Sequence, residues 1–382
     1  MTQADSAAAD AESALVARAR ALADERIRPH AADVDMRERY PEEGLAALAA
    51  AGLCGLSVPK AYGGLDADAR TACHVIEEIS RGCASTGALM LTYAGSTLAL
   101  VHYASADMRD RYLPGVATGQ LSLGFALTER HCGSDAAAIR ASAVREGDGW
   151  VLNGDKAWIG NAARADLIVV AVKTDPAAGG KGMSSFLVPR GTPGVEIGEI
   201  YSKMGARGTV HSDLHLRNVR LGPAHLLGRE NQGFAQMMHS LDYVRLVTAA
   251  HATGIARAAY DEAVRYVRER ETFGQPLSRH QALAFMVADM ATELHAARLV
   301  MLDAARCLDA GQKVGAQAAM AKLVATETAT RIAHRAVQIH GAWGVKVGSV
   351  VERAYRDARV TEIWDGTSEI QRLIIARSIL GR

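Results

Sequence analysis

The sequence lacks the features that define several large classes of protein. Its five cysteines are scattered and never form a C-x-x-C pair, so neither a disulfide framework nor a structural zinc site is indicated. The 43 lysines and arginines balance the 42 aspartates and glutamates, which gives no support for a nucleic-acid or membrane-surface partner. Aromatic residues make up only 5% of the chain, which favours close-packed helices over an aromatic binding platform. What remains is a chain of 382 residues, long enough for two or three domains and a large buried core.

Targeting and membrane signals are also missing from the sequence pattern. Residues 1–10 are small, polar and acidic, without the basic start and apolar core of a signal peptide. We expect no apolar run to approach the length that spans a bilayer. Together with the scattered cysteines, these absences predict a protein of the reducing cytoplasm that has no membrane partner.

Two common nucleotide-binding motifs are absent as well. No G-x-x-x-x-G-K-[ST] loop occurs, and the strand–helix setting of a Rossmann G-x-G-x-x-G is missing, which disfavours a nicotinamide-binding fold. Residues 338–345 nevertheless form a turn of small residues, which lets a pyrophosphate come near the backbone. A phosphate-bearing ligand therefore remains compatible with the sequence.

The hydrophobic pattern changes twice along the chain. Residues 12 to about 120 have helical spacing, the middle third has short β-branched runs, and helical spacing returns after Asn231. Within the middle third, residues 150–159 predict two strands joined by an Asn153-Gly154-Asp155 turn. The strongest helical signal is a four-and-three repeat typical of a bundle helix, at Leu283, Val287, Met290, Leu294, Ala297, Met301, Ala304 and Leu308. The sequence predicts an α+β fold with an N-terminal α-helical domain (1–120), a middle β domain (121–230) and a C-terminal four-helix-bundle-type domain (231–382).

A turn near the C-terminus carries the candidate catalytic residue. An apolar lead-in ends at Trp364, and Asp365 and Gly366 break the pattern. Ser368 and Gln371 have capping-box spacing, which predicts that a helix starts at Ser368. A carboxylate held between an aromatic ring and a helix N-terminus could act as a base. The alternative is a turn aspartate whose side chain bonds its own backbone, which is the commoner use of Asp-Gly.

Two further loops offer groups for a polar ligand, and each has a plainer interpretation. The loop 126–135 presents hydroxyls and backbone N–H groups that could bind a ring edge or a phosphate, although most such loops are only turns. Its His131 and Cys132 have no partner at ligand spacing, which argues against a metal site. Arg270 and Thr272 interrupt the long helices and suit a phosphate, although Arg270 could simply interact with the helix C-terminus.

Taken together, these segments resemble the acyl-CoA dehydrogenase family from about residue 20 to the end. The matching segments, in chain order, are 28–30, 55–64, 127–135, 158–159, 203–208, 270–274, 338–344 and 366–372. The resemblance implies one FAD per subunit and a homotetramer built as a dimer of dimers. It also implies an acyl thioester of coenzyme A or of a carrier protein as substrate, and an electron acceptor such as an electron-transfer flavoprotein.

The resemblance further implies roles for individual residues, with Asp365 in the position of the catalytic base. The flavin ring would meet Phe125, Leu127, Thr128, Trp158 and the backbone at Gly160. The rest of FAD, partly across a subunit boundary, would be bound by Arg270, Thr272, Phe273, Gln281, Gln338 and Gly341, with Thr367 and Glu369 touching it near the turn. The thioester would be lined by Asp242, Arg245, Trp364, Gly366, Arg377 and Ser134, the last of which also stands among the cofactor contacts. For Arg245 and Arg377 the alternative is a surface or ion-paired arginine.

Several residues depart from the family pattern. Most of the family has Glu where this chain has Asp365, and a subgroup places its base where this chain has Val244, so Asp365 is the one candidate at either position. Gly160 stands where the family commonly has Thr, with its hydroxyl at flavin N5. The other departures are residues 130–132, where Pro-Gly-Ala is usual, and Ala342, where glycine is usual. Two of these changes lie at the reacting centre.

The leading hypothesis is FAD-dependent α,β-dehydrogenation of an acyl thioester, with Asp365 as the α-proton base and flavin N5 as the hydride acceptor. A buried carboxylate beside Trp364 is expected to have a raised pKa, which favours its use as a base near neutrality. Three alternatives stay open. The first is a biosynthetic dehydrogenase of carrier-bound acyl groups, and the second is a flavin oxidase resembling the nitroalkane-oxidising branch, which uses Asp as base. The third is a non-catalytic flavoprotein, suggested by the missing Glu and Thr.

Overall fold

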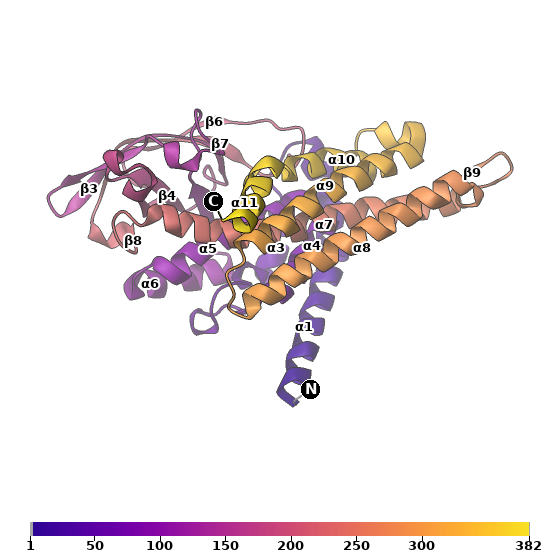
Figure 1. The fold of residues 1–382 in the computed structure, drawn as a ribbon, viewed down its shortest axis with the longest axis horizontal. Helices are drawn as coiled ribbons and strands as arrows, with labels where there is room; N and C mark the ends of the chain where they lie inside the picture. The colour runs from indigo at the N-terminus through magenta and orange to yellow at the C-terminus, as the bar shows by residue number, and fades with distance from the viewer. Residues whose placement is uncertain (1–2, 382) are drawn as a thin grey trace.

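The computed structural model describes residues 3–381, in which a helical part, a β-sheet and a second helical part follow one another along the chain (Figure 1). This order confirms the predicted fold class. The first part is joined by short 3₁₀ and π turns and consists of α1 (Gln3–Leu22), α2 (Ala31–Met36), α3 (Glu42–Ala50), α4 (Ala69–Gly82), α5 (Ala84–Tyr103) and α6 (Ala106–Thr118). Polar caps set two of the starts, because Asp68 accepts the backbone N–H of Thr71 at α4 and Ser105 accepts that of Met108 at α6.

Helix α5 corrects one expectation from the sequence. By length and composition it could cross a membrane, with a mean hydropathy of 1.3 over its most apolar window, so the expectation that no apolar run reaches that length is wrong. Within the structure, 83% of that window is buried. Burial on nearly all sides of a helix requires the same apolar composition as a membrane span. Packing against protein therefore accounts for the character of α5.

The middle part is an eight-stranded mixed sheet. Its order is β6-β7-β3-β2-β4-β5-β8, and β1 pairs in parallel with β4. The strands are β1 (Leu123–Ala126), β2 (Ser142–Glu146), β3 (Gly149–Gly160), β4 (Leu167–Lys173), β5 (Met183–Pro189), β6 (Val195–Ile200), β7 (His211–Leu221) and β8 (Leu226–Leu227). The β-branched run of β4 is buried along its whole length, as expected for a central strand.

The predicted hairpin at residues 150–159 is wrong. These residues belong to the single strand β3, which stays paired with β7 through two register shifts. Gly154 lies at one shift with φ of 141°, and a Cβ there would lie 2.5 Å from the Cα of Ala141. Asn153 bonds Asn218 of β7, with the backbone N–H of Asn218 donating to its Oδ1 at 2.8 Å. Asn-Gly-Asp therefore marks a bulge that keeps the ladder intact and needs glycine for close backbone approach.

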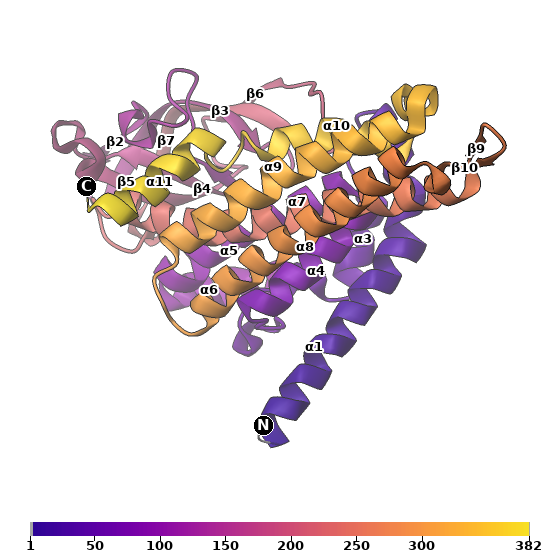
Figure 2. The same ribbon diagram turned by 45° about the vertical axis from the view of Figure 1, so that its right-hand side comes forward.

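The C-terminal part is a set of long helices interrupted by one small hairpin. It comprises α7 (Gly233–Glu269), β9 (Glu271–Thr272), β10 (Gln275–Pro276), α8 (Gln281–Asp309), α9 (Gly315–His340), α10 (Val350–Thr361) and α11 (Ser368–Leu380). The predicted seam of α8 faces the core, with Met290, Leu294, Ala297, Met301 and Ala304 buried. Figures 1 and 2 both show the β9–β10 hairpin at the end of the bundle that is farthest from the sheet.

The two helical parts share one hydrophobic core. A single cluster of buried side chains runs from Ala19 of α1 to Ala358 of α10, and α4 and α5 both pack against α7. The β-sheet has a cluster of its own, from Ala126 to Leu221. Helix α7 is therefore the element against which both the N-terminal helices and α9 are positioned, and the site described next lies along it.

Candidate active site

Asp365 lies in the turn between α10 and α11, where the backbone itself is unusual. Asp365 has φ of 55° and Gly366 has φ of 93°. A left-handed backbone is uncommon for a residue other than glycine and is often found at functional sites. Thr367 and Glu369, the predicted FAD contacts near the turn, follow directly, the first half-buried and the second exposed.

The predicted start of a helix at Ser368 is confirmed, since α11 begins there, but the predicted Ser368–Gln371 capping box does not form. Thr367 is the N-cap, and its hydroxyl accepts the backbone N–H of Ile370 at 3.4 Å, while Ser368 is already helical and buried. Gln371 does not close a capping box, because its Nε2 donates instead to the carbonyl of Gly366 at 2.7 Å. The glutamine thus holds the turn rather than the helix end.

The carboxylate of Asp365 is surrounded by groups from other helices. Thr248 of α7 donates its hydroxyl proton to Oδ2 at 2.9 Å, and Lys322 of α9 donates to the carbonyl of Gly366 at 2.7 Å. Burial raises the pKa of Asp365, while Lys322, the Thr248 hydrogen bond and Arg245 oppose that rise. Burial also lowers the pKa of Lys322 to about 8, although the negative charge of Asp365 acts to raise it. Asp365 is therefore bonded across the fold, which weakens the alternative of a simple turn aspartate.

Trp364 packs between two histidines that are held neutral. Its ring lies 6.2 Å from that of His211 of β7 and 5.7 Å from that of His251 of α7, centroid to centroid. Burial lowers the pKa of each histidine to about 3. Ser80 bonds Nδ1 of His251 at 2.8 Å, which fixes that ring. The wall beside Asp365 is therefore aromatic and uncharged near neutral pH.

The predicted thioester contacts fall into two sets. Arg245 is buried and pairs with Asp242, Nη1 to Oδ1 at 2.6 Å, one turn along α7 from Thr248. Arg245 lies near enough to Asp365 for its charge to oppose the rise in the pKa of that carboxylate, and Trp364 and Gly366 flank Asp365 in the turn itself. Arg377 on α11 and Ser134 in the 126–135 loop are exposed, and no recorded contact joins either one to the turn. The buried ion pair of Arg245 agrees with one of the two alternatives for that residue.

The residues predicted to meet the flavin ring lie close together at one edge of the sheet. Phe125 lies on β1, and the buried Leu127 and half-buried Thr128 follow it. The backbone N–H of Ala157 on β3 donates to the carbonyl of Thr128 at 3.0 Å, which brings Trp158 beside that loop. Trp158 has φ of 60° and leaves 53% of its surface exposed. A large exposed aromatic face beside a hydroxyl suits a flat aromatic ligand with polar edges.

Gly160 connects this edge of the sheet to the turn that carries Asp365. A Cβ at Gly160 would lie 3.3 Å from Oγ1 of Thr92 and 3.5 Å from Nε2 of His211. The ring of His211 in turn stacks beside Trp364, the neighbour of Asp365. The sheet edge and the turn are thus two sides of one region, and the groups present there fit FAD.

The predicted contacts to the remainder of FAD gather elsewhere. They lie in and after the β9–β10 hairpin and at the end of α9, at Arg270, Thr272, Phe273, Gln281, Gln338 and Gly341. Tyr266 of α7 stacks on His340 at 4.1 Å between centroids, which brings the two groups to the same end of the bundle. Phe273 is 97% exposed, and the figures place its hairpin far from the sheet (Figures 1 and 2). Within one chain the two halves of the predicted FAD site are therefore separate.

Four polar residues of this region were not identified from the sequence: Thr92, His211, Thr248 and Lys322. Thr92 and Thr248 lie among apolar and small residues, and His211 begins the polar-alternating strand β7, so none of the three stands out in the sequence. Lys322 had a detectable signal, because it interrupts the small-residue face of α9 that is otherwise made of Ala318, Ala321, Ala325 and Ala329. A lysine at a core position of a helix is rare unless it is paired.

A possible metal-binding cluster occurs in the 126–135 loop. Glu129, His131 and Cys132 bring ligand atoms within 4.8 Å of one another, so the expectation that the His-Cys pair has no partner is wrong. Glu129 is already committed, since it binds Lys156 at 2.8 Å and accepts the backbone N–H groups of residues 140 and 141. Lys156 is fully buried, and its charge opposes a cation at this position. We assign no metal to the cluster.

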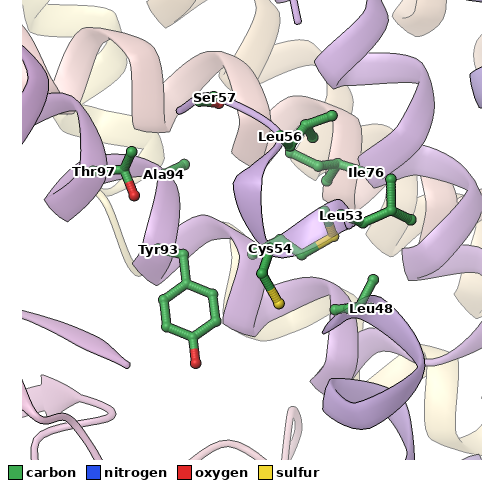
Figure 3. Close-up of a pocket in the computed structure, with 10 residues that line it drawn as sticks. Leu48, Leu53, Cys54, Leu56, Ser57, Ile76, Tyr93, Ala94 and Thr97 are labelled. Atoms are coloured by element: carbon green, nitrogen blue, oxygen red, sulfur yellow. The ribbon is translucent and has the colours of Figure 1, made fainter. Parts of the chain in front are cut away.

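The small cavity shown in Figure 3 lies in the N-terminal helical core, and none of its lining residues belongs to the Asp365 turn. It has a volume of about 20 Å³, room for about one water molecule, and is lined by Leu48, Leu53, Leu56, Ile76 and Tyr93, among others. Ser57 at its wall bonds the hydroxyl of Tyr243 on α7 at 3.0 Å. The cavity is too small for an acyl chain and belongs to the packing of the core.

Three family models match the chain in order. They describe the N-terminal, middle and C-terminal domains of acyl-CoA dehydrogenases and match residues 9–120, 124–219 and 231–380. The chain is 39% identical over 362 residues to a probable acyl-CoA dehydrogenase, fadE25, of Mycobacterium leprae, covering 94% of this chain and 93% of that one. It is 40% identical over 363 residues to a cyclohex-1-ene-1-carbonyl-CoA dehydrogenase of Geobacter metallireducens, covering 94% and 96%.

Solved structures agree with this assignment. One solved chain comes from a structure of the electron transferring flavoprotein of Acidaminococcus fermentans. It superimposes with a TM-score of 0.95 at 34% identity, covering 97% of this chain and 98% of that one. The prolyl acyl carrier protein oxidase AnaB gives 0.93 at 28% identity (97% and 99%). A glutaryl-CoA dehydrogenase of Mycobacterium smegmatis in complex with FADH2 gives 0.92 at 28% identity (100% and 96%). The chain belongs to the acyl-CoA dehydrogenase family, and it is an FAD-dependent oxidoreductase.

Proposed function

We propose that this protein dehydrogenates an acyl thioester between its α and β carbons, with Asp365 removing the α proton. The observation that carries the proposal is the half-buried carboxylate of Asp365, on a left-handed turn, with one oxygen bonded to Thr248 and the other without a hydrogen-bond partner among the residues that the structure describes. When bound, FAD supplies the acceptor for the β hydride. The chain itself must hold the carboxylate within hydrogen-bond reach of the substrate carbon and keep water from it.

The electrostatics of the turn support a base. Burial raises the pKa of Asp365, which makes its carboxylate more basic than an exposed aspartate. The ammonium of Lys322 and the guanidinium of Arg245 oppose that rise in pKa, because a nearby positive charge favours the ionised carboxylate. Val244 stands at the alternative position for a base, where it offers no titratable group, and it packs against Gly95.

Two unpartnered donors support a polar ligand beside the turn. The Nε of Arg245 and the Nε1 of Trp364 are buried and have no hydrogen-bond partner among the described residues. Buried donors in native proteins are nearly always satisfied, so an unpaired pair beside one carboxylate points to a ligand. The carbonyl and amide groups of a thioester's pantetheine arm can accept from such donors.

The substrate tether is the finer part of the proposal. We propose a coenzyme A thioester, because the relatives named above are acyl-CoA dehydrogenases by sequence. The likeness to a prolyl acyl carrier protein oxidase supports the second candidate, an oxidase or dehydrogenase of carrier-bound acyl groups. Release of peroxide in air on reoxidation would favour the oxidase. Both candidate functions would use Asp365, which is one methylene shorter than glutamate, as the base.

The separated halves of the FAD site bear on how the protein assembles. We propose that a second copy of the chain supplies the hairpin-end residues, within a homotetramer, and that an electron-transfer flavoprotein accepts the electrons. The likeness to the chain described under such a flavoprotein supports the latter. Five free, buried cysteines in the described part of the chain support a location in the reducing cytoplasm.

The test is anaerobic stopped-flow bleaching of the flavin by a panel of acyl thioesters. Asp365→Asn keeps the shape of the side chain but cannot accept the proton, so flavin reduction should slow by about 10²–10⁴-fold, the usual contribution of a positioned base. FAD content and melting temperature serve as controls and should remain near the wild-type values. Equal reduction rates in the two proteins would remove Asp365 as the base.

Asp365→Glu extends the test to the geometry of the site. In a site shaped for the shorter side chain, the additional methylene crowds the substrate and the rate falls. A rate above wild type with ordinary acyl-CoA substrates would show instead that the site is a weakened form of the usual glutamate site.

A further inference from the structure

The hydroxyl of Thr248 departs from the usual behaviour of threonine in a helix. A helical threonine commonly donates to the carbonyl four residues earlier. Thr253 on α7 follows this rule, donating to Ala249 at 2.7 Å, and Thr326 on α9 donates to Lys322 at 2.8 Å. Thr248 is fully buried, and its one recorded hydrogen bond crosses to Oδ2 of Asp365 at 2.9 Å. Its hydroxyl is therefore directed at the carboxylate rather than at its own helix.

Three helices each contribute one donor to the Asp365–Gly366 turn. Thr248 of α7 binds the side chain, while Lys322 of α9 and Gln371 of α11 both donate to the carbonyl of Gly366 at 2.7 Å. The two side-chain donors to the Gly366 carbonyl fix where the turn lies. They leave the torsion of the carboxylate free, and the Thr248 hydrogen bond is the contact that sets it.

We propose that Thr248 is a positioning residue for Asp365, which occupies Oδ2 and leaves Oδ1 as the oxygen that accepts the substrate proton. The inference rests on the proposed function. A carboxylate that is one methylene shorter than glutamate has less reach, so an error in its rotation moves the accepting oxygen away from the substrate carbon. A neutral hydroxyl achieves this without the ion pair that would lower the basicity of the carboxylate.

The charged and titratable groups around Asp365 determine how a change at Thr248 is read. Lys322 and Arg245 face it from α9 and α7, Asp242 pairs with Arg245, and the acidic Glu362 and Glu369 act on Lys322. The neutral rings of His211 and His251 flank Trp364. None of these groups is altered when a threonine becomes valine, so a shift in pH dependence reports the lost hydroxyl.

The variants are Thr248→Val, which keeps the shape and removes the hydroxyl, and Thr248→Ser, which keeps the hydroxyl. Thr253→Val is the matched control, since it removes a hydroxyl from the same buried helix without touching Asp365. In Thr248→Val we expect flavin reduction to slow roughly tenfold, the order of one hydrogen bond to a charged group. The acid limb of the pH profile should move to higher pH, because a bond that favours the ionised carboxylate has been removed.

Thr248→Ser should restore the rate and the acid limb toward wild type, and Thr253→Val should change neither. An independent readout is the Asp365 carboxyl band, taken as the infrared difference between each protein and its Asp365→Asn version across pH without substrate. In Thr248→Val the protonated band should persist to higher pH. If valine at 248 prevents folding, Thr248→Ala takes its place in both measurements.

The outcomes separate this inference from the proposed function. A wild-type rate in Asp365→Asn overturns the proposed function and this inference with it. If Asp365→Asn is slow but Thr248→Val keeps the wild-type rate and the wild-type acid limb, this inference alone is overturned. A slower Thr248→Val whose pH limb and carboxyl band do not move, or an equal loss in Thr253→Val, means that the threonine only packs, and it also overturns the inference.

Discussion

Two carboxylates of this protein, the buried Glu78 and the half-buried Asp365, lie beside cations and yet differ in their pKa shifts. Glu78 of α4 binds three arginines, with Arg20 at 2.9 Å, Arg81 at 3.0 Å and Arg257 at 3.0 Å. Burial opposes its ionisation, but these groups outweigh burial and lower its pKa to about 2. Asp365 has one neutral hydrogen bond and no recorded ion pair, so burial prevails and its pKa is raised.

The difference shows how the fold distinguishes a carboxylate that holds helices together from one that keeps an oxygen free. A carboxylate whose oxygens are all taken by guanidinium groups has neither free lone pairs nor basicity to offer. Glu78 and its neighbour Glu77 instead connect α1, α4, α7 and α8, because Arg20, Arg257 and Arg298 reach them from three other helices. Asp365 keeps one oxygen and a raised pKa. Burial alone therefore does not set the direction of a carboxylate's pKa shift, because the charged partners of Glu78 reverse it.

Removing the paired carboxylate should produce the largest effect on the fold. Glu78→Gln leaves three arginines without their shared partner, and breaking a buried ion pair on one side costs about 3–5 kcal/mol. We expect a clearly lower melting temperature at pH 7, measured by calorimetry on the FAD-loaded protein. The rate of flavin reduction per folded molecule should remain near wild type at temperatures where the variant is folded. A normal melting temperature would mean that the arginine cluster is held together without Glu78.

Lys322→Gln should produce an intermediate effect, on chemistry rather than on folding. Glutamine can still donate to the carbonyl of Gly366, but the positive charge that favours ionised Asp365 is gone. We expect flavin reduction at neutral pH to slow by roughly tenfold, as when one charge-assisted contact is lost. The acid limb of the pH profile should move upward. Lys322→Arg, which keeps the charge, is the matched comparison, and an unmoved acid limb in Lys322→Gln would contradict the electrostatic role.

The smallest expected effect is in the wild-type protein. Its two carboxylates should make the stability of the fold depend on pH in opposite directions. Glu78 has a depressed pKa in the folded state, so the stability it contributes is complete above its ordinary value of 4.5 and is lost as pH falls toward about 2. Asp365 has a raised folded pKa, so it weakens stability as pH rises through that pKa. If Asp365 is the base, as proposed, flavin reduction needs its ionised form, and the acid limb of the reduction rate should lie above the ordinary 3.8.

Both dependences are measurable on one sample set. Melting temperature against pH, compared between wild type and Glu78→Gln, should converge in acid, where Glu78 is protonated in both the folded and the unfolded state. The acid limb of flavin reduction in Glu78→Gln should coincide with that of wild type. An acid limb at or below 3.8 would mean that Asp365 is solvated more strongly than its surroundings indicate.

The sequence by itself determined the order of helical, β and helical parts, the seam of α8 and the turn that carries Asp365. Each of these depends on local signals: apolar spacing along one helix face, β-branched runs, and Asp-Gly before a helix. Local signals also caused the errors. Asn153-Gly154-Asp155 has the composition of a hairpin turn, and only its pairing with β7 shows that the strand continues.

Only the tertiary structure decided which groups meet Asp365. Thr248 and Lys322 lie 117 and 43 positions before it, and although Lys322 stands out on the small-residue face of α9, neither helix pattern indicates that its residue meets Asp365. The sequence supplied the carboxylate, but its basicity depends on which partners the packing of α7, α9 and the turn brings near and which it keeps away. Desolvation and hydrogen bonding act over a few ångströms in space, whatever the separation along the chain, and for that reason the reactive state of Asp365 follows from the fold.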